Sequence, residues 1–136
     1  MVNLKKMDHV AIAVKDLEDS LTRWRDSLGM KPGPIEEIAE RGVRLCKLTT
    51  ADGPGIELVS PLGADSPVAK FLAEHGEGIH HFCFEVEDIE GILEELKGKG
   101  ARLINTQPVR GAEGSRIAFI HPESFNGVLI EVKQLG

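Results

Sequence analysis

Short stretches of alternating hydrophobic and polar residues recur along the chain and predict β-strands. Between His9 and Val14 every second residue is bulky and apolar, and the stretch from His80 to Val86 alternates in the same way. Neighbouring side chains of a strand point to opposite faces, so one face of each stretch is expected to be buried. Each stretch therefore predicts a strand with one apolar face, and each contains a histidine near its start.

A helical pattern follows each of these strands. Its apolar residues are spaced three or four apart, as on one face of a helix. They are Leu17, Leu21, Trp24 and Leu28 in the first segment, and Ile89, Ile92, Leu93 and Leu96 in the second. Asp16 and Asp88 stand where an N-cap residue accepts hydrogen bonds from first-turn amides, and Gly29 and Gly100 stand where a left-handed residue ends a helix. The two segments therefore predict equivalent helices.

The strands and helices belong to an internal repeat. The first helix is followed by two β-patterned stretches, "GVRLCKLTT" and "GIELVSP", and the second by "RIAFIHP" and "GVLIEVKQ". With a short strand directly after each helix, the order β-α-β-β-β occurs twice. We therefore predict an α+β fold in a single domain over residues 1–136, with one module at about 5–62 and a second at about 78–135.

The alternation also separates the two adjacent histidines. His9 lies on the strand face opposite Val10 and Ile12, and His81 lies opposite Phe82 and Phe84. His80 shares the parity of the bulky residues, so His81, and not His80, repeats His9.

Each module also repeats a glutamate in its last strand. Glu57 stands between Ile56 and Leu58, and Glu131 stands between Ile130 and Val132, so each faces away from its apolar neighbours. Taken singly, such residues are more often solvated or hydrogen-bonded. Their coincidence at matched places predicts one site of two imidazoles and two carboxylates, a set that suits Co²⁺, Ni²⁺, Mn²⁺, Fe²⁺ or Zn²⁺.

Composition narrows the function further. The chain has 41% hydrophobic and 28% charged residues and a net charge of −6, which favours a globular protein and argues against nucleic acid as a partner. No apolar run is long enough to span a membrane, and the N-terminal stretch alternates instead of forming an apolar signal core. Cys46 and Cys83 are interpreted as small buried residues of a protein in a reducing compartment. We therefore expect no membrane association and a cytoplasmic location.

These features resemble the vicinal oxygen chelate superfamily, which includes glyoxalase I, extradiol dioxygenases and fosfomycin-resistance enzymes. Within it, several stretches resemble the methylmalonyl-CoA epimerase family: "DHVAIAVKDLEDSLTRWRDSLGM", "ERGVRLCKL", "IELVSPLGADSPVAKFL", "GEGIHHFCFEVEDI" and "IAFIHPESFNGVLIEVKQ". Together they cover nearly the whole chain, and the run with "SPVAKFL" and "GEGIHH" is the most specific. The resemblance implies that the two modules form one half-open, barrel-like mixed sheet around a metal site.

The resemblance also implies an activity and residue roles. It implies a homodimer that binds a divalent metal, most often Co²⁺, with Mn²⁺, Ni²⁺ or Zn²⁺ as alternatives. It also implies interconversion of (2R)- and (2S)-methylmalonyl-CoA by removal and return of the C2 proton through a metal-stabilised enolate. The metal ligands carried over are His9, Glu57, His81 and Glu131, and the acid–base residues are Glu40 and Glu131. Arg41 departs from the Gln or His that many relatives have there.

Contacts to the acyl-CoA are predicted at four further residues: Arg110, Ser115, Arg116 and Lys70. A solvated hairpin remains the alternative for the "GAEGS" turn, and a helix surface for Lys70. Two other functions stay open. A glyoxalase I acting on a glutathione hemithioacetal would share all four ligands, whereas non-catalytic small-molecule-binding members of the superfamily tend to lose them. A dioxygenase is disfavoured, because its Fe²⁺ prefers two histidines and one carboxylate.

Overall fold

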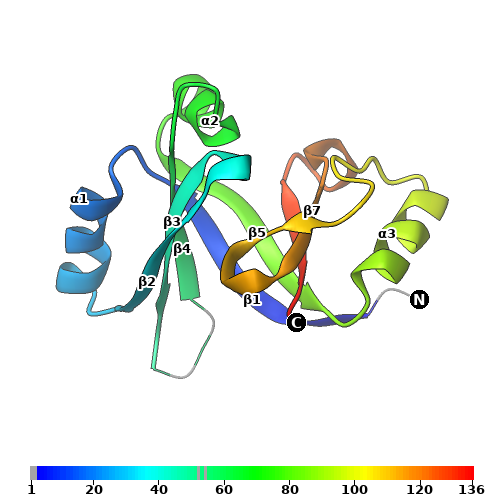
Figure 1. Cartoon of the computed structure of the whole chain (residues 1–136), viewed down its shortest axis with the longest axis horizontal. Coiled ribbons are helices and arrows are strands. Elements are labelled where there is room, and N and C mark those ends of the chain that lie inside the picture. Colours follow the sequence, from blue (N-terminus) through cyan, green and yellow to red (C-terminus); the bar gives the residue numbers. More distant parts are fainter. Residues whose placement is uncertain (1–2, 52, 54) are drawn as a thin grey trace. The chain divides into compact units, whose positions relative to one another are not determined.

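The structure is a computed structural model, and it describes residues 3–51, 53 and 55–136. The chain divides into two compact units. One comprises His9–His80, and the other comprises Met1–Asp8 together with His81–Gly136. We call them the first-module unit and the second-module unit, because each contains most of one of the two predicted β-α-β-β-β modules (Figure 1).

The first-module unit contains a four-stranded sheet with the order β2-β3-β4-β1. Strands β1 and β4 are parallel, and the other neighbours are antiparallel. The strands are β1 (Leu4–Ala13, in this unit from His9 onward), β2 (Lys31–Ile38), β3 (Val43–Thr49) and β4 (Gly55–Pro61). The helices are α1 (Leu17–Leu21), the π-helix η1 (Thr22–Ser27), the 3₁₀ turn η2 (Ala39–Arg41) and α2 (Pro67–His75).

The second-module unit repeats this topology. Its strand order is β5-β8-β7-β6, with β5 and β8 parallel and the other neighbours antiparallel. The strands are β5 (Gly78–Val86, in this unit from His81 onward), β6 (Val109–Arg110), β7 (Arg116–Ile120) and β8 (Ile130–Gln134). The helices are α3 (Ile89–Gly98) and the 3₁₀ turns η3 (Ala112–Gly114) and η4 (Pro122–Ser124). The predicted α+β class and the twofold β-α-β-β-β order are therefore confirmed.

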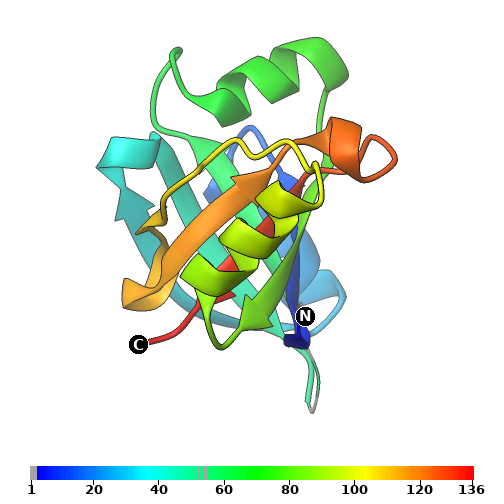
Figure 2. The ribbon, with the colours of Figure 1, turned by 90° about the vertical axis from the view of Figure 1, so that its right-hand side faces the viewer.

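Each sheet has one face covered by its own helix. In the first-module unit, α1 packs against β3 and β4, and Val14, Leu17 and Leu58 belong to the core between them. In the second-module unit, α3 lies across β7 and β8 (Figure 2), where Ile89 and Val132 are buried. Removal of this apolar surface from water stabilises each unit, and it leaves the other face of each sheet for polar side chains.

The helix boundaries follow the predicted signals. The Asp16 carboxylate accepts a hydrogen bond from the Asp19 amide at 3.0 Å, and the Asp88 carboxylate accepts one from the Gly91 amide at 3.1 Å. Gly29 has a φ of +72°, so the first helical segment ends in the left-handed region that glycine tolerates best.

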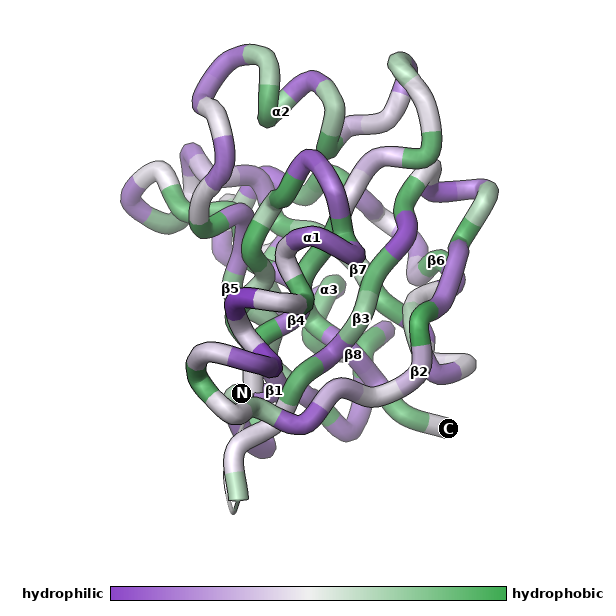
Figure 3. The backbone as a smooth tube through the Cα atoms, turned by 90° about the vertical axis from the view of Figure 1, so that its left-hand side faces the viewer, coloured by the Kyte–Doolittle hydropathy of each residue, from purple (hydrophilic) through white to green (hydrophobic). Residues whose placement is uncertain are grey.

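The predicted apolar stripe of the first helix is wrong at its end, because Leu28 is 66% exposed. The α-helical turns end at Leu21, and Thr22–Ser27 continue as a π-helix. A π-helix has more residues per turn than an α-helix, so the stripe drifts beyond Leu21. Trp24 is still partly buried against the core, whereas Leu28 is not. Figure 3 shows hydrophobic and hydrophilic residues alternating along α1 and along β3. Among the described residues, no helix has the length and apolar character needed to cross a membrane.

Candidate metal centre

In the first-module unit, a histidine and a glutamate form a buried pair. The parallel register of β1 and β4 places Glu57 opposite Ala11, two residues beyond His9 and on the same strand face. The distance between His9 Nε2 and Glu57 Oε1 is 3.5 Å, and both side chains are buried. Leu58 points into the core under α1, and this fixes Glu57 on the opposite face.

The second-module unit contains an equivalent pair. Glu131 stands opposite Cys83 in the parallel register of β5 and β8, again two residues beyond the histidine. His81 Nε2 and Glu131 Oε1 form a hydrogen bond of 3.0 Å, and both side chains are buried. The Phe119 ring packs edge-on against the His81 ring, with centroids 5.2 Å apart, and so restricts the orientation of the imidazole. Strand parity predicts that His80 and His81 lie on opposite faces of β5. These contacts place His81 beside Glu131.

These pairs suit a divalent cation. Burial of a carboxylate is costly unless a positive charge or several donors compensate it. Imidazole nitrogens and carboxylate oxygens are ligands that Co²⁺, Mn²⁺, Ni²⁺ and Zn²⁺ accept. Each unit therefore presents one imidazole and one carboxylate whose chemistry fits a bound metal ion, at the residues expected from the sequence.

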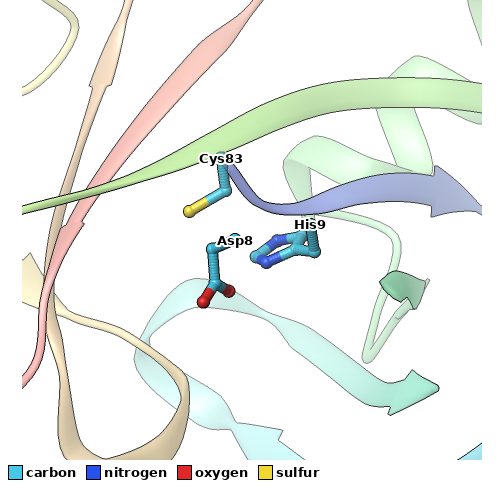
Figure 4. Close-up of side chains that lie close together, drawn as sticks. All are labelled: Asp8, His9 and Cys83. Carbon is cyan, nitrogen blue, oxygen red and sulfur yellow. The ribbon is translucent and has the colours of Figure 1, made fainter. Parts of the chain in front are cut away.

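Asp8 and Cys83 in the second-module unit also lie close together, with ligand atoms within 4.8 Å of one another (Figure 4). Burial, followed by the charge of Glu131, raises the pKa of the Cys83 thiol, so the sulfur stays protonated. The Lys133 ammonium lies 3.3 Å from the Asp8 carboxylate and already compensates its charge. A neutral thiol and a lysine-paired carboxylate are poor metal ligands, and we assign no metal to them.

The remaining histidines lie in other surroundings. The His80 ring packs edge-on against Phe71 of α2, at a centroid distance of 4.8 Å. His75 is the last residue of α2 and lies on the same phenylalanine, also at 4.8 Å. The Nδ1 atom of His121 accepts a hydrogen bond from the Glu123 amide at 3.0 Å and caps the η4 turn.

Glu40 lies on the exposed η2 turn of the first-module unit. The turn is followed by Gly42, whose φ of +66° returns the chain to β3. The role of Glu40 as an acid–base residue stays a prediction.

The four predicted acyl-CoA contacts fall into two groups. Arg110 and Arg116 stand opposite each other in the β6–β7 hairpin, and Arg116 forms an ion pair with Glu90. Ser115 is buried, and its hydroxyl donates to the Ala112 carbonyl at 2.6 Å within the turn of that hairpin. Lys70 is exposed on α2, as expected for a helix-surface lysine. Contact of these residues with substrate stays a prediction.

Sequence reasoning missed a buried lysine beside Glu131. Lys133 is 2% exposed, lies on the same face of β8 as Glu131, and contacts Asp8 and Glu113. The alternation in "IEVKQ" already places Lys133 on the Glu131 face. The strand alternation therefore contained a signal for Lys133. Its partners Asp8 and Glu113 carry no such signal, because they come from distant parts of the sequence.

Comparison with known proteins places the chain in a family. The family model of the glyoxalase/bleomycin resistance protein/dioxygenase superfamily matches residues 8–119. The chain belongs to this superfamily. Its topology of two equivalent modules, each with a buried His–Glu pair, is therefore that of a glyoxalase-type fold.

Within the superfamily, the chain is similar to epimerases acting on acyl-CoA. It is 42% identical over 132 residues to an ethylmalonyl-CoA/methylmalonyl-CoA epimerase of Cereibacter sphaeroides, covering 96% of this chain and 98% of the relative. Its fold matches methylmalonyl-CoA epimerase of Mycobacterium tuberculosis with a TM-score of 0.93 at 36% identity, covering 98% of this chain and 89% of that one.

A further solved structure contains a substrate. It is a methylmalonyl-CoA epimerase in complex with methylmalonyl-CoA and NH₄⁺. This chain matches it with a TM-score of 0.90 at 36% identity, covering 97% of this chain and 95% of that one.

Proposed function

We propose that this superfamily member is a methylmalonyl-CoA epimerase that interconverts the 2R and 2S forms of its substrate. The observation that carries the proposal is similarity to enzymes of this name over nearly the whole chain, at up to 42% identity. The buried imidazole and carboxylate in each module supply the ligand chemistry that such an enzyme needs.

The proposed metal ligands are His9, Glu57, His81 and Glu131, acting together on one divalent ion. Two lines support this set: the pairs occupy the same register in both modules, and the chain belongs to a superfamily whose members bind metal ions. The chemistry supplied by such an ion is Lewis-acid stabilisation of the negative charge that develops on the thioester oxygen. Co²⁺ is the proposed ion, and Mn²⁺, Ni²⁺ and Zn²⁺ suit the same ligands.

Inversion at C2 requires two proton-transfer groups on opposite faces of the substrate, and we assign them to Glu40 and Glu131. One carboxylate takes the C2 proton and leaves an enolate, and the other carboxyl group returns a proton to the opposite face. A carboxyl group serves as such a base when its environment brings its pKa towards neutrality. The buried position of Glu131 supports this role.

The rest of the proposal concerns binding, assembly and location. We place Arg110, Ser115, Arg116 and Lys70 at the acyl-CoA, whose phosphates and carboxylate would attract the cationic side chains. We also propose a homodimer, which the family resemblance implies and which light scattering would test. Cys46 and Cys83 are both buried free thiols, which supports a cytoplasmic location.

The decisive experiment measures deuterium uptake at C2 of methylmalonyl-CoA. The metal-loaded protein is incubated with substrate in D₂O, and exchange is followed by mass spectrometry against a sample with chelator. We expect fast, metal-dependent exchange that is lost in Glu131→Gln. Exchange no faster than the chelated control, with metal shown to be bound, would contradict the proposal and favour a glyoxalase I acting on a glutathione hemithioacetal.

A further inference from the structure

Lys133 is the buried centre of an ion triplet in the second-module unit. Its side chain is 3% exposed, and its Nζ atom lies 3.3 Å from Asp8 Oδ2 and 2.7 Å from Glu113 Oε1. The triplet connects three elements: β1, β8 and the η3 turn.

The fold does not require charged residues at this place. In the first-module unit, the pair that follows Glu57 in the register is Ala13 opposite Val59, and both are buried. The equivalent residues of the second-module unit are Glu85 and Lys133, which stand opposite each other in the register and are also buried. Each forms ion pairs with other residues: Glu85 with Lys5, and Lys133 with Asp8 and Glu113. Burial of an ion pair is often no more stabilising than burial of apolar residues of similar size. Since one module packs well with an apolar pair, stability alone does not account for the charges in the other.

The Glu113 end of the triplet belongs to a tight turn. Glu113 has a φ of +61°, a left-handed conformation that glycine adopts more easily than glutamate. The Gly111 amide donates to the Ser115 carbonyl at 2.9 Å, and the Ser115 amide donates to the Ala112 carbonyl at 3.1 Å. Glu113 therefore adopts a backbone conformation that is unfavourable for a residue with a side chain, and that side chain forms the ion pair with Lys133.

The turn also connects the two arginines to the strand of Glu131. It joins β6 to β7, so Arg110 and Arg116 stand directly at its base. Lys133 follows Glu131 by two residues on the same face of β8, roughly 7 Å along a strand. A single buried ammonium thus holds a turn with two cationic neighbours against the strand that carries Glu131.

We propose that Lys133 is a positioning residue that holds the Gly111–Ser115 turn against β8 and thereby orients the β6–β7 hairpin for acyl-CoA binding. The inference rests on the proposed function, because it assigns the hairpin to the acyl-CoA. Lys133 itself acts through Glu113 and the turn, so its loss should affect substrate binding more strongly than proton exchange.

The test compares Lys133→Met and Glu113→Gln with wild type in two readouts. The first is amide hydrogen exchange of residues 111–115, for which we expect faster exchange in both variants because the turn loses its anchor. The second is steady-state kinetics with methylmalonyl-CoA, for which we expect KM to rise by about tenfold while kcat stays nearly unchanged. This effect is smaller than the roughly hundredfold loss of activity that a misplacement of 1 Å can cause, because the hairpin is loosened and not removed. The double variant should be no worse than Lys133→Met alone.

Controls separate this role from a general effect on stability. Lys99→Met removes an exposed ion pair with Glu95 in the same unit and should change neither readout. Glu113 is 53% exposed, so Glu113→Gln tests the proposal even where Lys133→Met does not fold.

The outcomes also separate this inference from the proposed function. A lower melting temperature with unchanged exchange at 111–115 and unchanged KM would overturn the positioning role. Faster exchange at 111–115 in a protein whose wild type shows no metal-dependent epimerisation would overturn the proposed function and leave the anchoring of the turn supported.

Discussion

His80 and His81 are neighbours in β5 and have different surroundings within their own units. His81 is 2% exposed and bonds to Glu131, whereas His80 is partly buried and packs against the Phe71 ring. One imidazole is therefore held beside a carboxylate, and the other beside an apolar ring. Only the first environment suits a metal ligand, because a ligand nitrogen must be accompanied by further donors.

Loss of a residue that only hydrogen-bonds to a metal ligand lowers metal affinity by up to about a hundredfold. Because His81→Ala removes a proposed ligand itself, we expect it to lower metal affinity by more than that. His80→Ala is the matched control and should keep the wild-type metal content, since it removes an aromatic contact with Phe71 and none of the proposed ligands. Isothermal titration with Co²⁺ gives the affinity, and elemental analysis gives the stoichiometry. Retention of wild-type affinity in His81→Ala would refute the assignment of His81 as a ligand.

Strand parity was sufficient to predict most of the candidate site at the residue scale. It separated His81 from His80 and placed Glu57 and Glu131 away from the core, because a strand has only two faces. It could not predict the partners of Lys133, since Asp8 and Glu113 come from distant segments that only the folded chain brings together. The acid–base role of Glu40 also depends on folded geometry, and no spacing rule addresses it.

At the scale of elements, two glycines of α3 differ in their surroundings. A Cβ at Gly91 would collide with the Asp88 carboxylate that caps the helix, whereas a Cβ at Gly98 would meet no atom within 4 Å. Alanine is favoured over glycine inside a helix by about 1 kcal/mol, and loss of an aspartate cap costs about the same.

We therefore expect Gly98→Ala to raise the free energy of unfolding by up to about 1 kcal/mol. Gly91→Ala should give no such gain, because it displaces the Asp88 side chain from the Gly91 amide, and the two variants should differ by about 1 kcal/mol. Urea denaturation followed by circular dichroism measures both. Equal stabilisation by the two substitutions would show that the Asp88 cap contributes little.

Element boundaries were predictable where a single residue determines them. Asp16, Asp88 and Gly29 cap or end their helices as expected, because a cap needs only a local side chain or a local backbone conformation. The π-helix of Thr22–Ser27 was not predictable, because the apolar spacing assumes α-helical turns. Its consequence is the exposure of Leu28.

At the scale of the whole molecule, the internal repeat made the fold predictable. Two sequence segments with the same order of patterns form two sets of four strands with the same topology, and Glu57 and Glu131 occupy the same register in them. Equivalence between the modules thus supplied information that one sequence otherwise lacks. The charged residues Glu85 and Lys133 mark where the modules differ, and the contacts of Lys133 are where we place a function-specific role.

The repeat also allows a test of whether the two His–Glu pairs bind one ion or two. In the proposed function all four side chains share one ion. Wild type should therefore bind one Co²⁺ per chain, and both Glu57→Ala and Glu131→Ala should lose most of the affinity for Co²⁺.

The bound ion should also stabilise the fold. An ion at 100 times its dissociation constant stabilises the folded chain by about 2.7 kcal/mol, so chelator should lower the melting temperature of wild type and have little effect on either variant. Elemental analysis and thermal denaturation with and without chelator provide the measurements. Two ions per wild-type chain, with one retained in each variant, would show instead that each pair binds its own ion, and the proposed Lewis-acid role would then belong to one module alone.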